Sequence, residues 1–147
     1  MTRRIDAHVH VYAKATSEFP REVTDQFPAD GEAPVEGLLA AMEASDIHQA
    51  VLVQLGGGEI AHHRYLTRCL REHAGRFRGI GLIPDGCDDV EAHMRSLADD
   101  AGIIGFRLRE LGGLVDPFEP FDPAAVAAWP IWECAAKHDY VLWLYIG

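Results

Sequence analysis

The sequence predicts an α/β fold in which about five parallel strands alternate with four helices. Short apolar runs of strand length alternate along the 147 residues with segments whose apolar residues recur at helical spacing. Some of these runs are continuously apolar, which is typical of parallel strands that are buried on both faces. Because the strand–helix units repeat with strands of similar length, the pattern favours a partial TIM-like (β/α) barrel over a doubly wound sheet.

The first half of the chain supplies two of the predicted strands and two of the helices. The first strand starts at Ile5, whose β-branched side chain, like those of Val9 and Val11, suits an extended backbone. A polar stretch over residues 12–33 follows, and its length makes it a candidate functional loop. The remaining elements are a helix with apolar residues at 35, 38, 39 and 42, a buried strand over 50–55, a Gly56-Gly57-Gly58 turn, and a helix over 59–74.

The second half continues the alternation with three more strands. The expected elements are a strand over 77–83, a helix that starts at Asp88 or Asp89 and ends at Ala101, a strand over 103–108, a loop over 110–122, a helix that ends near His138, and a strand over 141–146. A complete barrel has eight strands and typically about 250 residues. We therefore expect a single domain over residues 1–147 that is truncated after strand five of such a barrel.

The composition argues against several classes of function. The formal net charge is −10, and so acidic a chain lacks the basic surface that nucleic acids and anionic membranes require. No segment has the roughly 18 to 20 consecutive apolar residues of a membrane span, and the N-terminus has no signal-peptide pattern. The three cysteines are widely separated, so they predict neither a disulfide framework nor a CxxC metal site. We expect a cytoplasmic protein.

The most specific motif is Asp6-Ala7-His8-Val9-His10, near the start of the chain. Side chains at alternate positions of a strand share one face, so Asp6, His8 and His10 are expected to point into the same site. Two neutral imidazoles at this spacing can hold a divalent metal and leave positions open for water or substrate. The motif also closes the first predicted strand, and active sites of α/β folds lie at the carboxyl ends of strands.

A second candidate lies at the end of the fourth predicted strand. Arg107 and Arg109 alternate along this strand and share one face with Gly105. A guanidinium group at the mouth of a barrel can hold a carboxylate through two parallel hydrogen bonds. Arg107 is therefore predicted to bind an anionic group of a small-molecule substrate.

A second histidine pair, His62-His63, starts the predicted second helix. Adjacent side chains on a helix do not face each other, so the two rings are not expected to serve one metal ion. We interpret this pair as surface residues.

Taken in order, these motifs resemble the N-terminal half of a barrel of amidohydrolase family 2, the amidohydrolase-related branch of the metal-dependent hydrolase superfamily. The resemblance spans essentially all of the chain, and the Asp-x-His-x-His start is its most specific part. The stretches that carry it are residues 5–10, 50–54, 63–66, 75–81, 102–108 and 130–133.

The resemblance implies a (β/α)8 barrel in which His8 and His10 bind a divalent metal, commonly zinc. We expect Asp6 to orient one of these two imidazole rings. Further ligands in the family are histidines on strands five and six, and an aspartate on strand eight acts as general base. The family hydrolyses lactones, amides and related bonds through a metal-bound or base-activated water. The same branch also contains decarboxylases and metal-independent lactonases.

The chain departs from this pattern on its fifth strand. Leu144-Tyr145-Ile146-Gly147 offers no histidine, and two ligands are fewer than the three that catalytic zinc normally takes from a protein. A metal-independent site is therefore a second interpretation. In it, His8 and His10 contact the substrate or its oxyanion directly, and Arg107 and Tyr145 polarise the substrate in place of the metal.

Three functions stay open at this point. The first is hydrolysis at a carbonyl-like carbon of a small carboxylate-bearing substrate, and the second is decarboxylation on the same scaffold. The third is a non-catalytic barrel fragment that acts only through oligomerisation, because an open sheet edge must be paired or covered. A homo-oligomer is the expected means of covering that edge.

Overall fold

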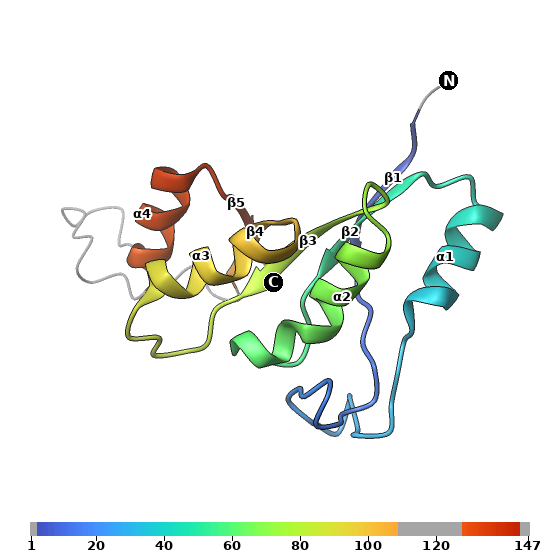
Figure 1. Ribbon diagram of the computed structural model, residues 1–147, viewed down its shortest axis with the longest axis horizontal. Coiled ribbons are helices and arrows are strands. Elements are labelled where there is room, and N and C mark those ends of the chain that lie inside the picture. Colours follow the sequence, from blue (N-terminus) through green and yellow to red (C-terminus); the bar gives the residue numbers. More distant parts are fainter. Residues whose placement is uncertain (1–2, 109–127, 145–147) are drawn as a thin grey trace, which may run out of the picture.

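The computed structural model describes residues 3–108 and 128–144, which form one parallel sheet with helices between its strands (Figure 1). The strands follow each other in space as they do along the chain, and each neighbouring pair is parallel. This sequential order is that of a barrel, and the sheet curls into half of one. The strands are β1 (Ile5–Val9), β2 (Gln49–Val53), β3 (Phe77–Leu82), β4 (Ile103–Leu108) and β5 (Val141–Leu144).

A helical segment separates each strand from the next, so the predicted partial barrel of five strands and four α-helices is confirmed over these residues. The α-helices are α1 (Val35–Ala44), α2 (Arg64–Glu72), α3 (Val90–Ala101) and α4 (Trp129–His138). The predicted helix over 59–74 is divided, because a 3-10 turn, η1 (Ile60–His63), precedes α2. In that turn the backbone N–H of His62 donates to the Glu59 carbonyl at 2.9 Å, three residues back.

The core lies between the sheet and the helices. Leu66, Cys69 and Leu70 recur at helical spacing on α2, and all three are buried. Burying a leucine-sized side chain contributes about 1.5 to 3 kcal/mol, so this stripe holds α2 on the sheet. The same cluster contains strand residues Ala50, Leu52, Phe77, Ile103 and Phe106, together with Met94 and Leu97 of α3.

The ends of α3 follow from residues that the sequence marks. The Asp89 carboxylate accepts a hydrogen bond from the backbone N–H of Ala92 at 2.9 Å, which satisfies a donor that the helix leaves unpaired. Gly102 ends the helix with φ at +77°, in the left-handed region that glycine adopts at low cost. The predicted start and end of this helix are therefore confirmed.

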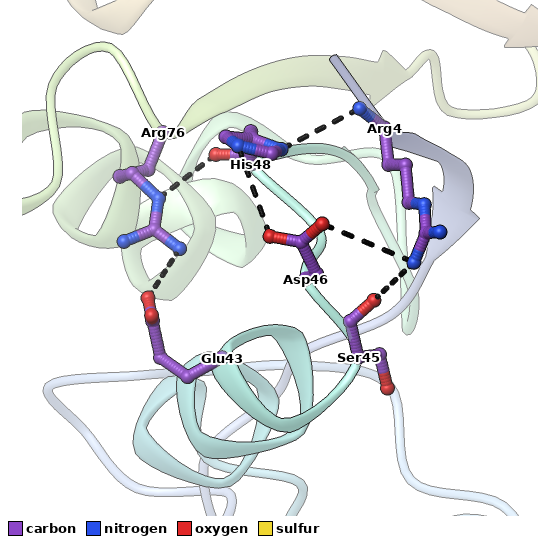
Figure 2. Close-up of polar contacts among 6 residues, drawn as sticks. All are labelled: Arg4, Glu43, Ser45, Asp46, His48 and Arg76. Carbon is purple, nitrogen blue, oxygen red and sulfur yellow. Dashed lines mark hydrogen bonds and ion pairs between the residues drawn. The ribbon is translucent and has the colours of Figure 1, made fainter. Parts of the chain in front are cut away.

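A polar cluster ties together the amino ends of the strands (Figure 2). Arg76, just before β3, donates from Nε to the His48 carbonyl at 2.9 Å and from its terminal nitrogen to the Glu43 carboxylate at 2.8 Å. Arg4, just before β1, donates to the Ser45 carbonyl at 3.2 Å. These bonds fix the turn from α1 to β2 against both neighbouring strands. In barrels this end serves stability, and the opposite end carries the chemistry.

A buried histidine fixes the other end of β3. His63 is fully buried, and its Nδ1 lies 2.8 Å from the Glu59 carbonyl, so Nδ1 carries the proton and donates. Its Nε2 accepts from the backbone N–H of Leu82 at 3.0 Å. The expectation that His63 is a surface residue is wrong. The reason is that η1 turns this ring onto β3, where Gly81 leaves room for it.

The close contact of β4 with β5 depends on Gly105. A Cβ atom at this position would overlap the backbone carbonyl oxygen of Val141 on β5. Gly105→Ala is therefore expected to lower the free energy of unfolding by about 2 kcal/mol or more, because two strands must move apart. Urea denaturation measures this change.

Gly37→Ala is the matched control for that substitution. No atom lies within 4 Å of a Cβ added to Gly37, which is within α1. Alanine there should raise the stability by about 0.5 to 1 kcal/mol through helix propensity. Equal effects of the two substitutions would contradict the packing of β4 on β5.

Because the His63 ring is buried, the protein is expected to lose stability in mild acid. Burial lowers the pKa of His63 from 6.5 to about 4, so the folded protein keeps this ring neutral. Between these two values the unfolded chain binds the proton and the folded chain does not, so the free energy of unfolding falls as the pH drops from 6.5 to 4. The expected loss is about 3 kcal/mol, measured by urea denaturation at several pH values.

His63→Gln is the test of that assignment, because glutamine offers an acceptor to the Leu82 N–H and does not titrate. Between pH 6.5 and 4, the free energy of unfolding of this variant should fall less steeply than that of the wild type, by the amount that His63 contributes. A slope as steep as in the wild type would rule His63 out as the acid-sensitive group.

Candidate active site

His8 and His10 lie together at the carboxyl end of β1. Their Nε2 atoms are 3.3 Å apart, and the two rings meet edge to face. A bulge between Asp6 and Val9 shifts β1 against β2 at this point. The structure thus brings both predicted imidazoles to one place, at the end of the strand where barrel active sites are found.

The backbone of β2 sets the proton position on His10. Its Nδ1 lies 2.8 Å from the carbonyl oxygen of Val53, which can only accept. In the neutral ring the proton is therefore on Nδ1, and Nε2 presents its lone pair. That lone pair faces Nε2 of His8.

Trp143 of β5 sets the proton position on His8. Its indole nitrogen Nε1, which can only donate, lies 3.0 Å from Nδ1 of His8. His8 Nδ1 therefore accepts, and in the neutral ring the proton is on Nε2. The Nε2–H group of His8 donates to Nε2 of His10. The four groups form one chain of hydrogen bonds that runs from Trp143 through both histidines to Val53.

Asp6 acts on the backbone of this site. Its carboxylate accepts a hydrogen bond from the backbone N–H of His8 at 3.1 Å. This contact spans two residues and stabilises the bulged segment. The ring contacts of the histidine pair come from Val53 and Trp143, so Asp6 positions His8 through the main chain.

The surroundings favour the neutral form of His8. Burial lowers the pKa of His8, and the nearby charges of His10 and Arg107 lower it further, while Asp6 acts weakly in the opposite sense. Arg107 reaches this region from β4, where it is the register partner of Trp143. The mouth of the half-barrel therefore combines the two imidazoles of His8 and His10 with the guanidinium cation of Arg107.

The spacing of this histidine pair suits a metal ion, but the proton positions do not. Two nitrogens bound to a tetrahedral zinc ion at about 2.05 Å are about 3.3 Å apart, which matches the spacing of the two Nε2 atoms. His10 also has the second contact that metal-bound histidines make, a proton donated to a carbonyl. His8 lacks this second contact, because its Nδ1 accepts a hydrogen bond from Trp143 and its proton is therefore on Nε2. Within residues 3–108 and 128–144, no group of three or more metal-binding side chains occurs. As arranged, these residues do not form a complete zinc site.

Two candidates from the sequence fall outside the part of the chain that the structure describes. These are Tyr145 and Arg109, together with the loop over 110–122. Cys69, by contrast, is described and buried, and burial raises the pKa of its thiol to about 11. A thiolate role for this cysteine is thereby excluded at neutral pH.

The loop from β1 to α1 is organised by Arg21, a residue that sequence reasoning missed. Its guanidinium group donates to the carbonyl oxygens of Ala13, Phe27 and Gly31, among others, and lies 5.2 Å from the centre of the Tyr12 ring. The backbone N–H of Glu22 donates to the Gly56 carbonyl at 2.7 Å, beyond the end of β2. Arg21 therefore gathers this loop at the carboxyl ends of β1 and β2. A lone arginine in a polar stretch gives no signal of such a role.

The comparisons with known proteins agree with this fold. A sequence model described as amidohydrolase matches residues 5–147. The chain belongs to the amidohydrolase family. No curated protein matches it.

Three crystal structures share the fold. The first, a probable 2-pyrone-4,6-dicarboxylic acid hydrolase from Acinetobacter baumannii with citric acid bound, is 20% identical and has a TM-score of 0.70 over 99% of this chain and 50% of that one. An amidohydrolase from Burkholderia multivorans with bound HEPES is 17% identical, with a TM-score of 0.63 over 96% and 47%. A protein from Agrobacterium tumefaciens is 19% identical, with a TM-score of 0.59 over 97% and 48%. The chain thus spans about half the length of these structures.

No helix within the described residues is long and apolar enough to cross a membrane. This finding agrees with the absence of a long apolar segment in the sequence.

Arg21→Ala is expected to release the loop over 12–33. The substitution removes all of its hydrogen bonds to main-chain carbonyls at once, and each such bond to a charged donor contributes about 1.5 to 3 kcal/mol. The amides of Tyr12, Ala15 and Glu22, which bond within this loop or to Gly56, should then exchange faster with deuterium.

Lys137→Ala is the control for the loop. Lys137 is an exposed residue of α4 that pairs with Glu91 of α3, away from the loop, so its loss should leave the exchange of the loop amides unchanged. Loop amides that stay protected in Arg21→Ala would show that other contacts order this segment.

Proposed function

We propose that this chain carries the first half of the active site of a hydrolase that acts at the carbonyl carbon of a small carboxylate-bearing substrate, with lactones as the preferred class. The observation that carries the proposal is the convergence of His8, Arg107 and Trp143 from three strands at one end of the sheet. A hydrogen-bond donor and a cation at one strand end are the groups that a carbonyl oxygen and a carboxylate require.

The hydrogen-bond donor is Nε2 of His8. In the structure its proton is donated to Nε2 of His10, and a substrate carbonyl oxygen in the mouth can take the place of that acceptor. When water adds to the carbonyl carbon, negative charge develops on this oxygen, and a donor in place stabilises it. The C–O bond of the lactone then breaks, and the leaving oxygen takes up a proton.

Arg107 supplies the contact for a substrate carboxylate. It lies half-buried at the carboxyl end of β4, close enough to His8 to lower the pKa of that ring. A planar guanidinium group pairs with a carboxylate through two parallel hydrogen bonds, which fixes the orientation of the substrate as well as its charge. The citric acid bound in the Acinetobacter baumannii structure and the dicarboxylic acid in that protein's name support a substrate of this class.

The general base is assigned to no described residue. In the family it is an aspartate on strand eight, and the described strands are the first five. The proposal therefore concerns substrate binding and oxyanion stabilisation, which this part of the chain can be tested for by itself.

The test is a titration of the chain with 2-pyrone-4,6-dicarboxylate, in which NMR measures binding. We expect shifts at His8, His10 and Trp143, and a weakening of binding by about tenfold or more in Arg107→Gln, because a charge-assisted pair is lost. The matched control is Arg68→Gln, on the exposed side of α2, which should bind as the wild type does.

The same samples separate the alternatives. If mass spectrometry detects opening of the lactone ring, hydrolysis is supported. Release of carbon dioxide would support decarboxylation instead. If the ligand fails to bind, or binds equally well to Arg107→Gln, this substrate class is wrong for the chain.

A further inference from the structure

The hydrogen bond between Trp143 and His8 joins the first strand to the last one described. β1 and β5 lie at opposite edges of the sheet, and the two residues are 135 positions apart in sequence. The indole nevertheless reaches Nδ1 of His8 at 3.0 Å, because the curl of the sheet brings the two strand ends to face each other.

We infer that Trp143 is a positioning residue that fixes the tautomer of His8 and so keeps the histidine pair as a hydrogen-bonding unit rather than a metal-binding one. The inference deepens the proposed function, since it explains why His8 presents a proton and not a lone pair to the mouth. It does not require any particular substrate.

The direction of the chain of hydrogen bonds follows from its two ends. An indole N–H only donates and a backbone carbonyl only accepts, so Trp143 and Val53 define the two ends without any choice of hydrogen positions. Between them, a neutral His8 must carry its proton on Nε2 and a neutral His10 on Nδ1. The contact between the two Nε2 atoms is then a hydrogen bond from His8 to His10.

This arrangement opposes a metal ion at His8. A metal needs the lone pair of Nε2, so the proton of His8 would have to move to Nδ1, where it would face the indole N–H of Trp143. The hydrogen bond from Trp143 would be lost and two donors would stand opposed. The nearby positive charge of Arg107 adds to the cost, while the Asp6 carboxylate acts in the opposite direction.

His10 has the arrangement that a metal-binding histidine needs, and no indole contacts its ring nitrogens. Its Nδ1 proton is held by the Val53 carbonyl, and its Nε2 lone pair is ready for a ligand. The spacing of the two Nε2 atoms suits a shared zinc ion equally well. The difference between the two histidines is therefore the contact made by the far nitrogen of each ring, and at His8 this contact is Trp143.

The first test measures the tautomers directly by nitrogen-15 NMR of the histidine rings at a pH where both are neutral. In the wild type we expect the proton of His8 on Nε2 and that of His10 on Nδ1. In Trp143→Phe, which keeps an aromatic ring but has no N–H, His8 should populate both tautomers. Trp132→Phe on α4 is the control and should leave both rings unchanged.

The second test is a zinc titration of the same proteins without substrate. Loss of the indole bond should make Trp143→Phe bind zinc about tenfold more tightly than the wild type, the equivalent of one ordinary hydrogen bond. The added affinity should disappear when His10→Ala is combined with Trp143→Phe.

Two outcomes would overturn the inference. One is a wild-type His8 with its proton on Nδ1, a result that needs no variant and so does not depend on how Trp143→Phe folds. The other is equal zinc affinity of the wild type and a folded Trp143→Phe. Neither readout involves substrate, so failure of the lactone experiments would leave both results interpretable.

Discussion

The curl of the parallel sheet is the constraint on which the rest of this structure depends. Adjacent parallel strands are rotated by roughly 20 to 25° against each other, and helices on one face let the rotation accumulate into a half-barrel. β1 and β5 share no backbone hydrogen bond, yet the curl brings Trp143 within 3.0 Å of His8. A flat sheet with the same five strands would keep these two side chains far apart.

The two ends of the sheet serve different purposes. At the amino ends, Arg4 and Arg76 bond to main-chain carbonyls of the α1–β2 segment and hold neighbouring strands together. At the carboxyl ends, the side chains of His8 and Trp143 bond to each other across the half-barrel, and Arg107 lies close to them. The polar groups at the amino ends thus bond to the main chain and stabilise the fold, while those at the carboxyl ends face the mouth of the half-barrel. This division is what the amidohydrolase fold provides to an active site.

The histidine pair shows how the contacts behind a site decide its chemistry. The same two rings at the same spacing can hold a cation or donate a hydrogen bond, and the choice depends on what the far nitrogen of each ring contacts. Val53 gives His10 an exposed lone pair, and Trp143 gives His8 an exposed proton. The motif by itself therefore does not decide whether a member of this family binds metal.

The sequence alone determined the strand and helix order, the ends of α3 at Asp89 and Gly102, and the place of His8 and His10 at the end of the first strand. These features follow from local periodicity, capping and strand parity, which are readable over a few residues. Only the tertiary structure decided the burial of His63, the role of Arg21 in its loop and the bond from Trp143 to His8. Each of these depends on partners brought near by the fold: a strand packed on η1, the carbonyls of a folded loop, and a strand end 135 residues away. No local pattern encodes such partners, because they become neighbours only when the sheet curls and the loop closes over it.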